Sequence, residues 1–123
     1  MGDRAVIGFR ADKEATPIFL YMHWGGCDRY LDAARAIEAA RPRWSQPDYA
    51  TRIAVSQFVQ NYWVEETGFG LSAGYDSFCQ PDYDDVILVD WASQSVHIVS
   101  ADDSSTVEQT FSFEEFLAIE VMS

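Results

Sequence analysis

The stretch DYDDVILVDWASQSVHIVS, residues 82–100, decides the fold class of this chain. Two apolar runs, Val86 to Trp91 and Val96 to Ser100, flank the four-residue polar turn 92–95. Short β-rich runs joined by a short polar turn are typical of a β-hairpin. This is the strongest hairpin signal in the chain, and the other elements are placed outward from it.

After the hairpin, a polar turn at 101–105 leads into a further strand predicted over 106–113. Apolar residues alternate with polar ones along that segment, which predicts a strand with one buried face. The alternating apolar residues are Val107, Phe111 and Phe113.

The end of this strand also carries a helix start signal. Ser112 and Glu115 have the spacing of a capping box, in which each side chain bonds the backbone N–H of the other residue. Phe111 and Phe116 stand at the hydrophobic staple positions. We therefore predict a final short helix that begins directly after the strand.

Before the hairpin, the segments 4–9 and 18–24 read as an antiparallel strand pair. The sequence then predicts a helix from Arg29 to Arg41, with Asp28 as its N-terminal cap. Pro42 should end that helix, because the residue before a proline is pushed out of the helical region.

A second helix is predicted from Pro47 to Val64, followed by a glycine-rich loop and a possible short strand over 69–73. The apolar face of this helix spans about half its circumference, which predicts substantial burial. That face contains Ala50, Ala54, Val55, Phe58, Val59 and Tyr62.

The element order is thus ββ-α-α-(β)-β-β-β-α. We predict an α+β fold, an antiparallel β-sheet packed on one side by two helices. A chain of 123 residues is too short for two independent cores, so residues 1–123 are expected to form a single globular domain.

Charge is distributed very unevenly along the chain. All eight basic residues lie between Arg4 and Arg52, whereas the segment from Ile53 to Ser123 contains thirteen carboxylates and neither Lys nor Arg. These carboxylates can be offset only from the first 52 residues, by solvent cations or by another molecule. This surface points to a cationic partner and away from nucleic acid or anionic lipid.

Adaptation to a salt-rich cytoplasm is an alternative explanation, because the chain has one Lys against seven Arg. Such acidity should coat the whole surface, whereas residues 1–52 are nearly balanced. No apolar run approaches the roughly 18 residues of a membrane span, and the N-terminus lacks a secretory pattern. We expect a cytoplasmic protein without membrane contact, and the sequence leaves its oligomeric state open, a homodimer included.

Several segments together resemble a family of short, uncharacterised phage and prophage proteins. The segments are RAVI at 4–7, LYMHWGG at 20–26 and GLSAGYD at 70–76, with an aspartate-rich stretch before Val86. The family usually has an N-R-A-V-I run and a Y-L-H-W-N-G-G segment, so Asp3, Gly25 and Cys27 depart from its pattern. The resemblance implies an origin in a mobile element and a target in the host cell, and it carries over no catalytic role.

The leading functional hypothesis is a small acidic inhibitor that imitates a nucleic acid. It would dock an acidic face on a basic, nucleic-acid-binding surface of a host defence or replication protein, with no direct contact to nucleic acid. Aromatic residues beside the acids, Tyr75, Tyr83 and Trp91, are either anchors of that interface or core residues. The candidate partner-binding acids are Glu65, Glu66, Asp76, Asp82, Asp84, Asp85, Asp102 and Asp103. Solvated acidic loops are the simpler explanation of the same residues.

An alternative hypothesis is a non-enzymatic sponge for a small anionic nucleotide. Glycines between a strand and a helix N-terminus can form an anion cradle. The candidate residues are Arg4, His23, Trp24, Gly25, Gly26 and Arg29, with Arg41 or Arg43 as further cations. A tight turn that requires glycine explains the same segment without a ligand. A virion or assembly accessory protein is a third hypothesis, supported by origin and size alone.

Catalysis and metal binding have the least support. Cys27 near a helix start has His23 or His97 as a candidate base, but no third orienting residue or catalytic signature accompanies it. His23, Cys27, Cys79 and His97 lack the paired spacing of zinc ligands. The acidic stretch 82–85 lacks the loop pattern of a calcium site. We expect no catalytic residues, no bound metal and no cofactor.

Overall fold

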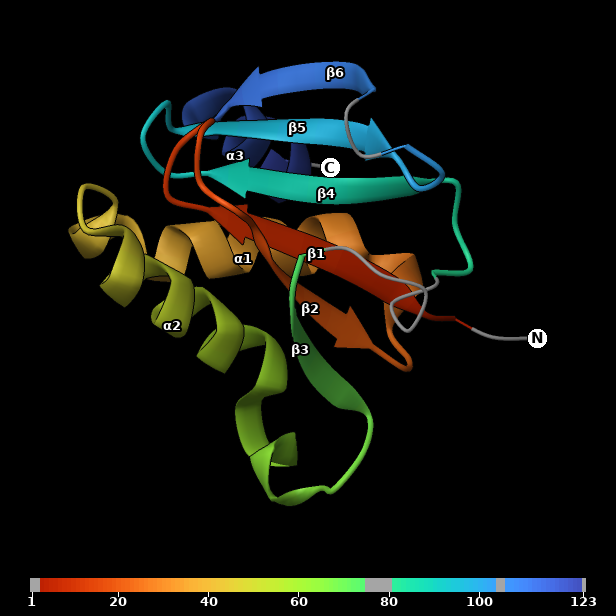
Figure 1. The fold of residues 1–123 in the computed structure, drawn as a ribbon. Coiled ribbons are helices and arrows are strands. Elements are labelled where there is room, and N and C mark those ends of the chain that lie inside the picture. Colours follow the sequence, from red (N-terminus) through yellow and green to blue (C-terminus); the bar gives the residue numbers. More distant parts are fainter. Residues whose placement is uncertain (1–2, 75–80, 104–105, 123) are drawn as a thin grey trace.

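The structure is a computed structural model that describes residues 3–74, 81–103 and 106–122. Six strands in these residues form one sheet in the order β3-β2-β1-β4-β5-β6 (Figure 1). The strands are β1 (Ala5–Arg10), β2 (Ile18–Met22), β3 (Phe69–Ala73), β4 (Asp85–Asp90), β5 (Ser95–Ser100) and β6 (Val107–Ser112). The α+β class, the first strand pair and the β4–β5 hairpin are confirmed.

The sheet is mixed, so the prediction of a purely antiparallel sheet is wrong at one position. β4 joins the free edge of β1 and runs parallel to it, whereas all other neighbouring strands are antiparallel. Both strands are apolar on both faces, as Val6, Ile7, Val86 and Ile87 are at most 1% exposed. Such continuous apolar runs are typical of central strands that are covered on both sides.

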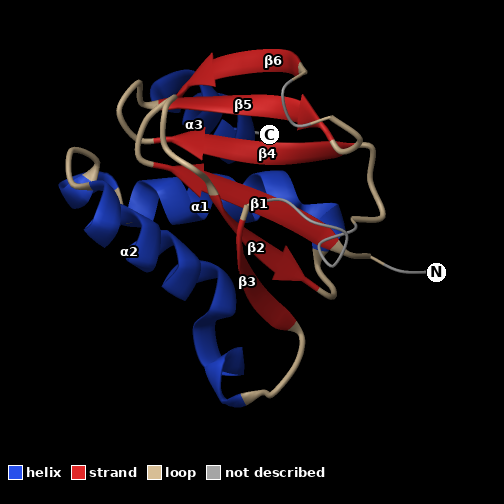
Figure 2. Ribbon diagram, in the orientation of Figure 1, coloured by secondary structure: helices blue, strands red, loops and turns tan. Residues whose placement is uncertain are grey.

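Three helices contribute to the main core on one face of the sheet, where two were predicted. They are α1 (Arg29–Ala39), α2 (Pro47–Val59) and α3 (Phe113–Met122), and Figure 2 shows α1 and α3 behind the sheet. α3 packs there because it buries Phe113, Phe116 and Leu117 in the same cluster. None of the described helices is long and apolar enough to cross a membrane.

The first helix begins at Arg29 as predicted but ends two residues before its predicted end at Arg41. α1 ends at Ala39, and Pro42 lies in the separate 3-10 turn η2 (Arg41–Arg43). Asp28 precedes α1 as predicted, but its side chain forms no capping hydrogen bond. It is instead the last residue of the 3-10 turn η1 (Gly26–Asp28), which already leads the chain into the helix.

The second helix is shorter and less buried than predicted. α2 ends at Val59, because Gln60 has a positive φ of 48°, and the chain continues as the 3-10 segment η3 (Gln60–Val64). Only Ala50 and Ala54 of α2 are fully buried, and Tyr62 is 49% exposed. α2 packs mainly on α1, so much of its apolar face stays near solvent.

The start of α3 follows the prediction. The backbone N–H of Ser112 donates to the Glu115 carboxylate at 2.8 Å, and the N–H of Glu115 donates to the Ser112 hydroxyl at 3.1 Å. The rings of Phe111 and Phe116 lie 6.0 Å apart, as a hydrophobic staple requires. The predicted burial along β6 fails at Val107, which is 50% exposed because it lies at the start of an edge strand.

Candidate functional site

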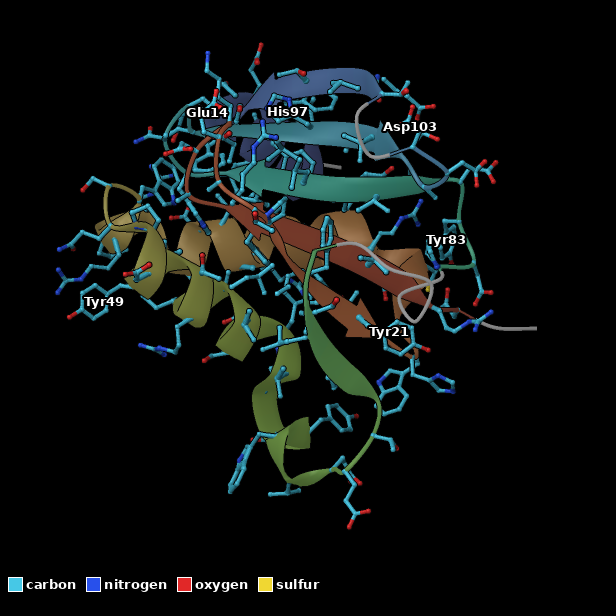
Figure 3. The ribbon with its side chains drawn as sticks, in the orientation of Figure 1. Glu14, Tyr21, Tyr49, Tyr83, His97 and Asp103 are labelled. Atoms are coloured by element: carbon cyan, nitrogen blue, oxygen red, sulfur yellow. The ribbon has the colours of Figure 1, made fainter. Side chains whose placement is uncertain are left out.

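The topology brings both sequence-predicted sites to one end of the sheet. β1, β3, β4 and β6 begin at this end, and β2 and β5 end there. Figure 3 shows Asp103, Tyr83 and Tyr21 along this side. We call it the acidic end, defined by Asp3, Arg4, Asp28, Arg29, Glu65, Glu66, Asp82, Asp84, Asp85, Asp102 and Asp103. The predicted site residue Asp76 lies outside the described residues, as do Tyr75 and Cys79.

Arg4 and Asp82, which the sequence assigned to two different sites, form an ion pair. The Arg4 guanidinium donates to Asp82 at 2.9 Å and 3.2 Å, and the backbone N–H of Arg4 donates to the same carboxylate at 2.8 Å. These bonds lower the pKa of Asp82 to about 2. The pair fastens the start of β1 to the segment before β4, so Arg4 is already neutralised.

Arg29 is held in the same way by Asp85. Its guanidinium donates to the Asp85 carboxylate at 3.0 Å and to the carbonyl of Gly26 at 2.9 Å. The guanidinium carbon also lies 3.8 Å from the centre of the Tyr83 ring, a cation–π contact. The Tyr30 hydroxyl donates to the other Asp85 oxygen, and burial and this bond raise the pKa of Tyr30 to about 12.

The Gly25-Gly26 segment is a close-packed turn whose donor is in use. Gly25 has a φ of 84°, and the N–H of Gly26 donates to the carbonyl of Asp3 at 2.9 Å. A Cβ on Gly26 would lie 2.6 Å from the Tyr83 ring and 2.7 Å from that carbonyl. The Tyr83 hydroxyl donates to the Asp3 carboxylate, which lowers the pKa of Asp3. Acidic and paired groups thus surround the predicted anion cradle.

The other residues of the predicted anion site also have partners. His23 is exposed, and its Nδ1 lies 2.9 Å from the Tyr21 hydroxyl. The Trp24 ring packs edge-on against Tyr62 and Phe69, at 5.6 Å and 5.7 Å between ring centres. The structure therefore joins these residues to the aromatic packing around η3 and β3.

Cys27 is exposed, but its surroundings disfavour the thiolate. The neighbouring Asp3 and Asp28 carboxylates raise the pKa of the Cys27 thiol, the hydrogen bond with Asp3 having the largest effect. An activated nucleophile needs the opposite shift. Within residues 3–74, 81–103 and 106–122, no group of three or more His, Cys, Asp or Glu side chains is arranged to hold a metal ion.

The remaining acids are the groups that stay available to a partner. The carboxylates of Glu65, Glu66, Asp84 and Asp102 are exposed and form no hydrogen bond or ion pair within the described part of the chain. Asp103 accepts a hydrogen bond from the Thr106 hydroxyl at 2.9 Å. Nine carboxylates against two arginines give the described acidic end a net charge of −7.

Of the three aromatic residues proposed as interface anchors, only Tyr83 remains a candidate among the described residues. Trp91 is 1% exposed and packs in the core against Phe9 and Phe113, so its interpretation as an anchor is wrong. Tyr83 lies at the acidic end but is covered on one side by Arg29.

The structure adds exposed aromatic residues to the acidic end: Tyr62 and Trp63, which the sequence analysis assigned to no site, and Trp24, which it assigned only to the alternative anion site. Trp24, Tyr62 and Trp63 are 41%, 49% and 75% exposed. Tyr62 and Trp63 line one hollow with Glu65, and Trp24 packs against Tyr62. The sequence signal was present in the wide apolar face of the predicted helix, which continued to Tyr62, but it was interpreted as burial.

Comparisons with known proteins add no relative. No family model matches the chain. No curated protein and no solved structure is significantly similar to it. The resemblance to short phage and prophage proteins therefore stays an expectation from the sequence, and the functional argument depends on the geometry.

Proposed function

We propose that this protein is a non-enzymatic binding protein whose acidic end docks on a basic, nucleic-acid-binding surface of another protein. The observation that carries the proposal is the gathering of carboxylates at one end of the sheet, several of them unpaired within the described residues, where Arg4 and Arg29 are the only described basic side chains. Exposed Trp24, Tyr62 and Trp63 at its edge are of the residue types that dominate binding energy in protein interfaces.

Charge density sets the expected strength of such mimicry. Six strands at about 4.8 Å spacing span roughly 24 Å, and duplex DNA of that length carries about 14 phosphate charges. The described acidic end, with a net charge of −7, has about half that density. Binding to a DNA-binding surface should therefore depend strongly on salt and need the aromatic contacts as well.

The nucleotide sponge has less support from the geometry. Its two nearest cations, Arg4 and Arg29, are neutralised by Asp82 and Asp85, and the N–H of Gly26 is bonded to Asp3. A nucleotide phosphate entering there would meet carboxylates first. In line with the sequence resemblance, we propose a bacterial host protein as the partner and the cytoplasm as the place of binding.

Competition with DNA tests the proposal. Tagged protein captures partners from a bacterial lysate, bound proteins are eluted with about 0.5 M salt and identified, and one basic partner is purified. We expect the protein to displace a short DNA duplex from this partner. The variant Asp84→Asn/Asp102→Asn should lose this ability, because both carboxylates are exposed and have no partner among the residues that the structure describes.

A matched control removes two charges at the other end of the sheet, Glu14→Gln/Asp48→Asn, and should displace DNA as the wild type does. Equal displacement by both double variants would contradict the proposal, as would a captured partner whose DNA binding is unaffected. Asp82 and Asp85 are avoided because their ion pairs stabilise the fold.

A further inference from the structure

A second polar region lies on the sheet face opposite the helices. Along β1, β4 and β5 the residues Phe9, Val89, Val96 and Ile98 face the helical core, so their neighbours in sequence face the other way. The strand register then aligns Arg10 with Asp90 and Ser95, and His97 with Thr110. Figure 3 shows His97 on the same side as Glu14, away from Tyr83 and Asp103.

These side chains form the floor of an open hollow of about 730 Å³. The loop between β1 and β2 contributes Asp12 and Lys13 to its wall, and the turn between β4 and β5 contributes Ser93. In Figure 1 the β1–β2 loop rises beside the ends of β4 and β5. The hollow therefore lies at the end of the sheet opposite to the acidic end.

Arg10 is the main fixed cation of the hollow. Its Nε donates to Asp90 Oδ2 at 2.6 Å, and the backbone N–H of Ser93 donates to Asp90 Oδ1 at 2.9 Å. Both oxygens of this nearly buried carboxylate are thus satisfied. The two terminal nitrogens of Arg10 have no hydrogen-bond partner among the described residues, although the side chain is only 20% exposed. Lys13 is exposed above them and has no described partner either.

A chain of hydrogen bonds completes the hollow. Thr110 Oγ1 lies 2.9 Å from His97 Nδ1, His97 Nε2 lies 3.2 Å from Ser95 Oγ, and Ser95 Oγ lies 2.6 Å from Ser93 Oγ. Burial, and next the charge of Arg10, lower the pKa of His97, so the ring is neutral near pH 7 and has one N–H.

Either tautomer of His97 leaves one hydroxyl donor free. If Nδ1 carries the proton, Thr110 accepts from it, and the Thr110 O–H can donate into the hollow. If Nε2 carries the proton, Ser95 accepts from it and donates to Ser93, and the Ser93 O–H is free. The chain therefore always offers a donor, in addition to Arg10 and Lys13.

We propose that this hollow binds the phosphoryl group of a small molecule. The free donors are the guanidinium end of Arg10, the ammonium of Lys13 and a hydroxyl, and the one free acceptor of a lining carboxylate in the described part of the chain is Oδ2 of the exposed Asp12. A phosphoryl group supplies three strong acceptor oxygens and the negative charge that these donors lack. Of the two carboxylates, Asp90 is fully bonded and Asp12 Oδ1 accepts from the N–H of Glu14 at 2.8 Å.

An NMR titration with inorganic phosphate tests the site directly. We expect saturating shift changes in the amides of Arg10, Lys13, Ser93 and His97. Lys13→Gln or Thr110→Val should weaken binding by roughly 2- to 5-fold, the usual effect of one exposed charge or one hydrogen bond. The control Arg52→Gln removes the same charge from an exposed position on α2 and should leave the affinity unchanged.

The titration of His97 is a second readout. A protonated ring donates from both nitrogens, which frees the hydroxyls of both Thr110 and Ser93 for the ligand, so bound phosphate should raise the pKa of His97. The charged groups around the ring are Arg10 and Asp90 on the sheet and Asp12 and Lys13 on the loop. Lys13 is exposed and has no ion-pair partner in the described part of the chain, so Lys13→Gln should remain folded.

Glycerol phosphate is the second probe. Binding as tight as that of inorganic phosphate, or tighter, assigns the hollow to a phosphate monoester, and weaker binding assigns it to free phosphate. Shift changes that do not saturate, or that centre on Arg41 and Arg43, would overturn the proposal. An unchanged pKa of His97 in saturating phosphate would do so as well.

Discussion

The two ends of the sheet use charge in opposite ways. At the acidic end, two arginines are paired with carboxylates and Glu65, Glu66, Asp84 and Asp102 are left unpaired. In the hollow at the other end, the Asp90 carboxylate is satisfied, and the groups without partners among the described residues are mainly donors, on Arg10, Lys13 and a hydroxyl chain, beside one oxygen of Asp12. The proposed partners differ accordingly, a basic protein surface at the acidic end and a phosphoryl group in the hollow.

The largest expected difference between the ends is in the stability of their ion pairs. Asp90→Ala leaves the mostly buried Arg10 unpaired and should reduce the free energy of unfolding by about 3 kcal/mol. Asp82→Ala breaks a more exposed pair and should cost clearly less. Urea unfolding measures the free energy of unfolding of both variants. Equal decreases would contradict the argument from the difference in burial.

The packing of the acidic end comes next. Gly26→Ala would place a Cβ 2.6 Å from the Tyr83 ring and should destabilise the fold by about 2 kcal/mol, the usual cost of overpacking. Gly25→Ala meets open space and should cost only about 1 kcal/mol, from its positive φ. The reverse order in thermal unfolding would show that Gly26 does not hold Tyr83 and Asp3 together.

The pH dependence of the Arg4–Asp82 pair is a smaller effect. The pKa of Asp82 is lowered from 3.8 to about 2, so the pair stabilises the protein above pH 3.8 and this contribution is lost as the pH falls to about 2. Wild type and Asp82→Asn should therefore differ in stability at about pH 5 and converge near pH 2. Urea unfolding between pH 2 and pH 5 measures the difference in stability between the two proteins. A difference that does not change with pH would contradict the lowered pKa of Asp82.

The smallest predicted effect is the relief of repulsion. Asp84→Asn/Asp102→Asn should raise the melting temperature slightly at low salt, because like charges at the acidic end repel one another, and the gain should vanish in salt. Glu14→Gln/Asp48→Asn at the hollow end should give no gain, since Asp48 lies in the first turn of α2 and favours the helix dipole. Calorimetry at low and high salt measures both melting temperatures. A gain for Asp84→Asn/Asp102→Asn that persists in salt, or a gain for Glu14→Gln/Asp48→Asn, would contradict this prediction.

Local sequence patterns predicted the individual elements well, whereas the pairing of segments far apart in the sequence was not predicted. The capping box at Ser112 and the β4–β5 hairpin involve residues close in sequence, and both are confirmed. The parallel pairing of β1 with β4 joins residues about 80 positions apart, and no local pattern encodes it. The apolar runs on both strands are typical of central strands, but they do not tell which strand lies beside which.

The same distinction applies to the candidate sites. Composition alone identified the surplus of carboxylates, but Arg4 and Asp82 are 78 positions apart, so their pairing was invisible in the sequence. The hollow was missed because Arg10, Ser95 and Thr110 come from three separate strands. Asp90 inside an apolar strand was the available signal, since a buried carboxylate requires a partner.

NMR mapping with a short arginine-rich peptide tests the central claim most directly, because the peptide supplies the positive charge of a basic partner whichever protein that partner is. We predict shift changes concentrated at the amides of Glu65, Glu66, Asp84 and Asp102, which disappear at about 0.5 M salt. Changes spread evenly over the surface, or centred on Glu14 and Asp48, would contradict the account of the acidic end as a docking surface for a basic partner.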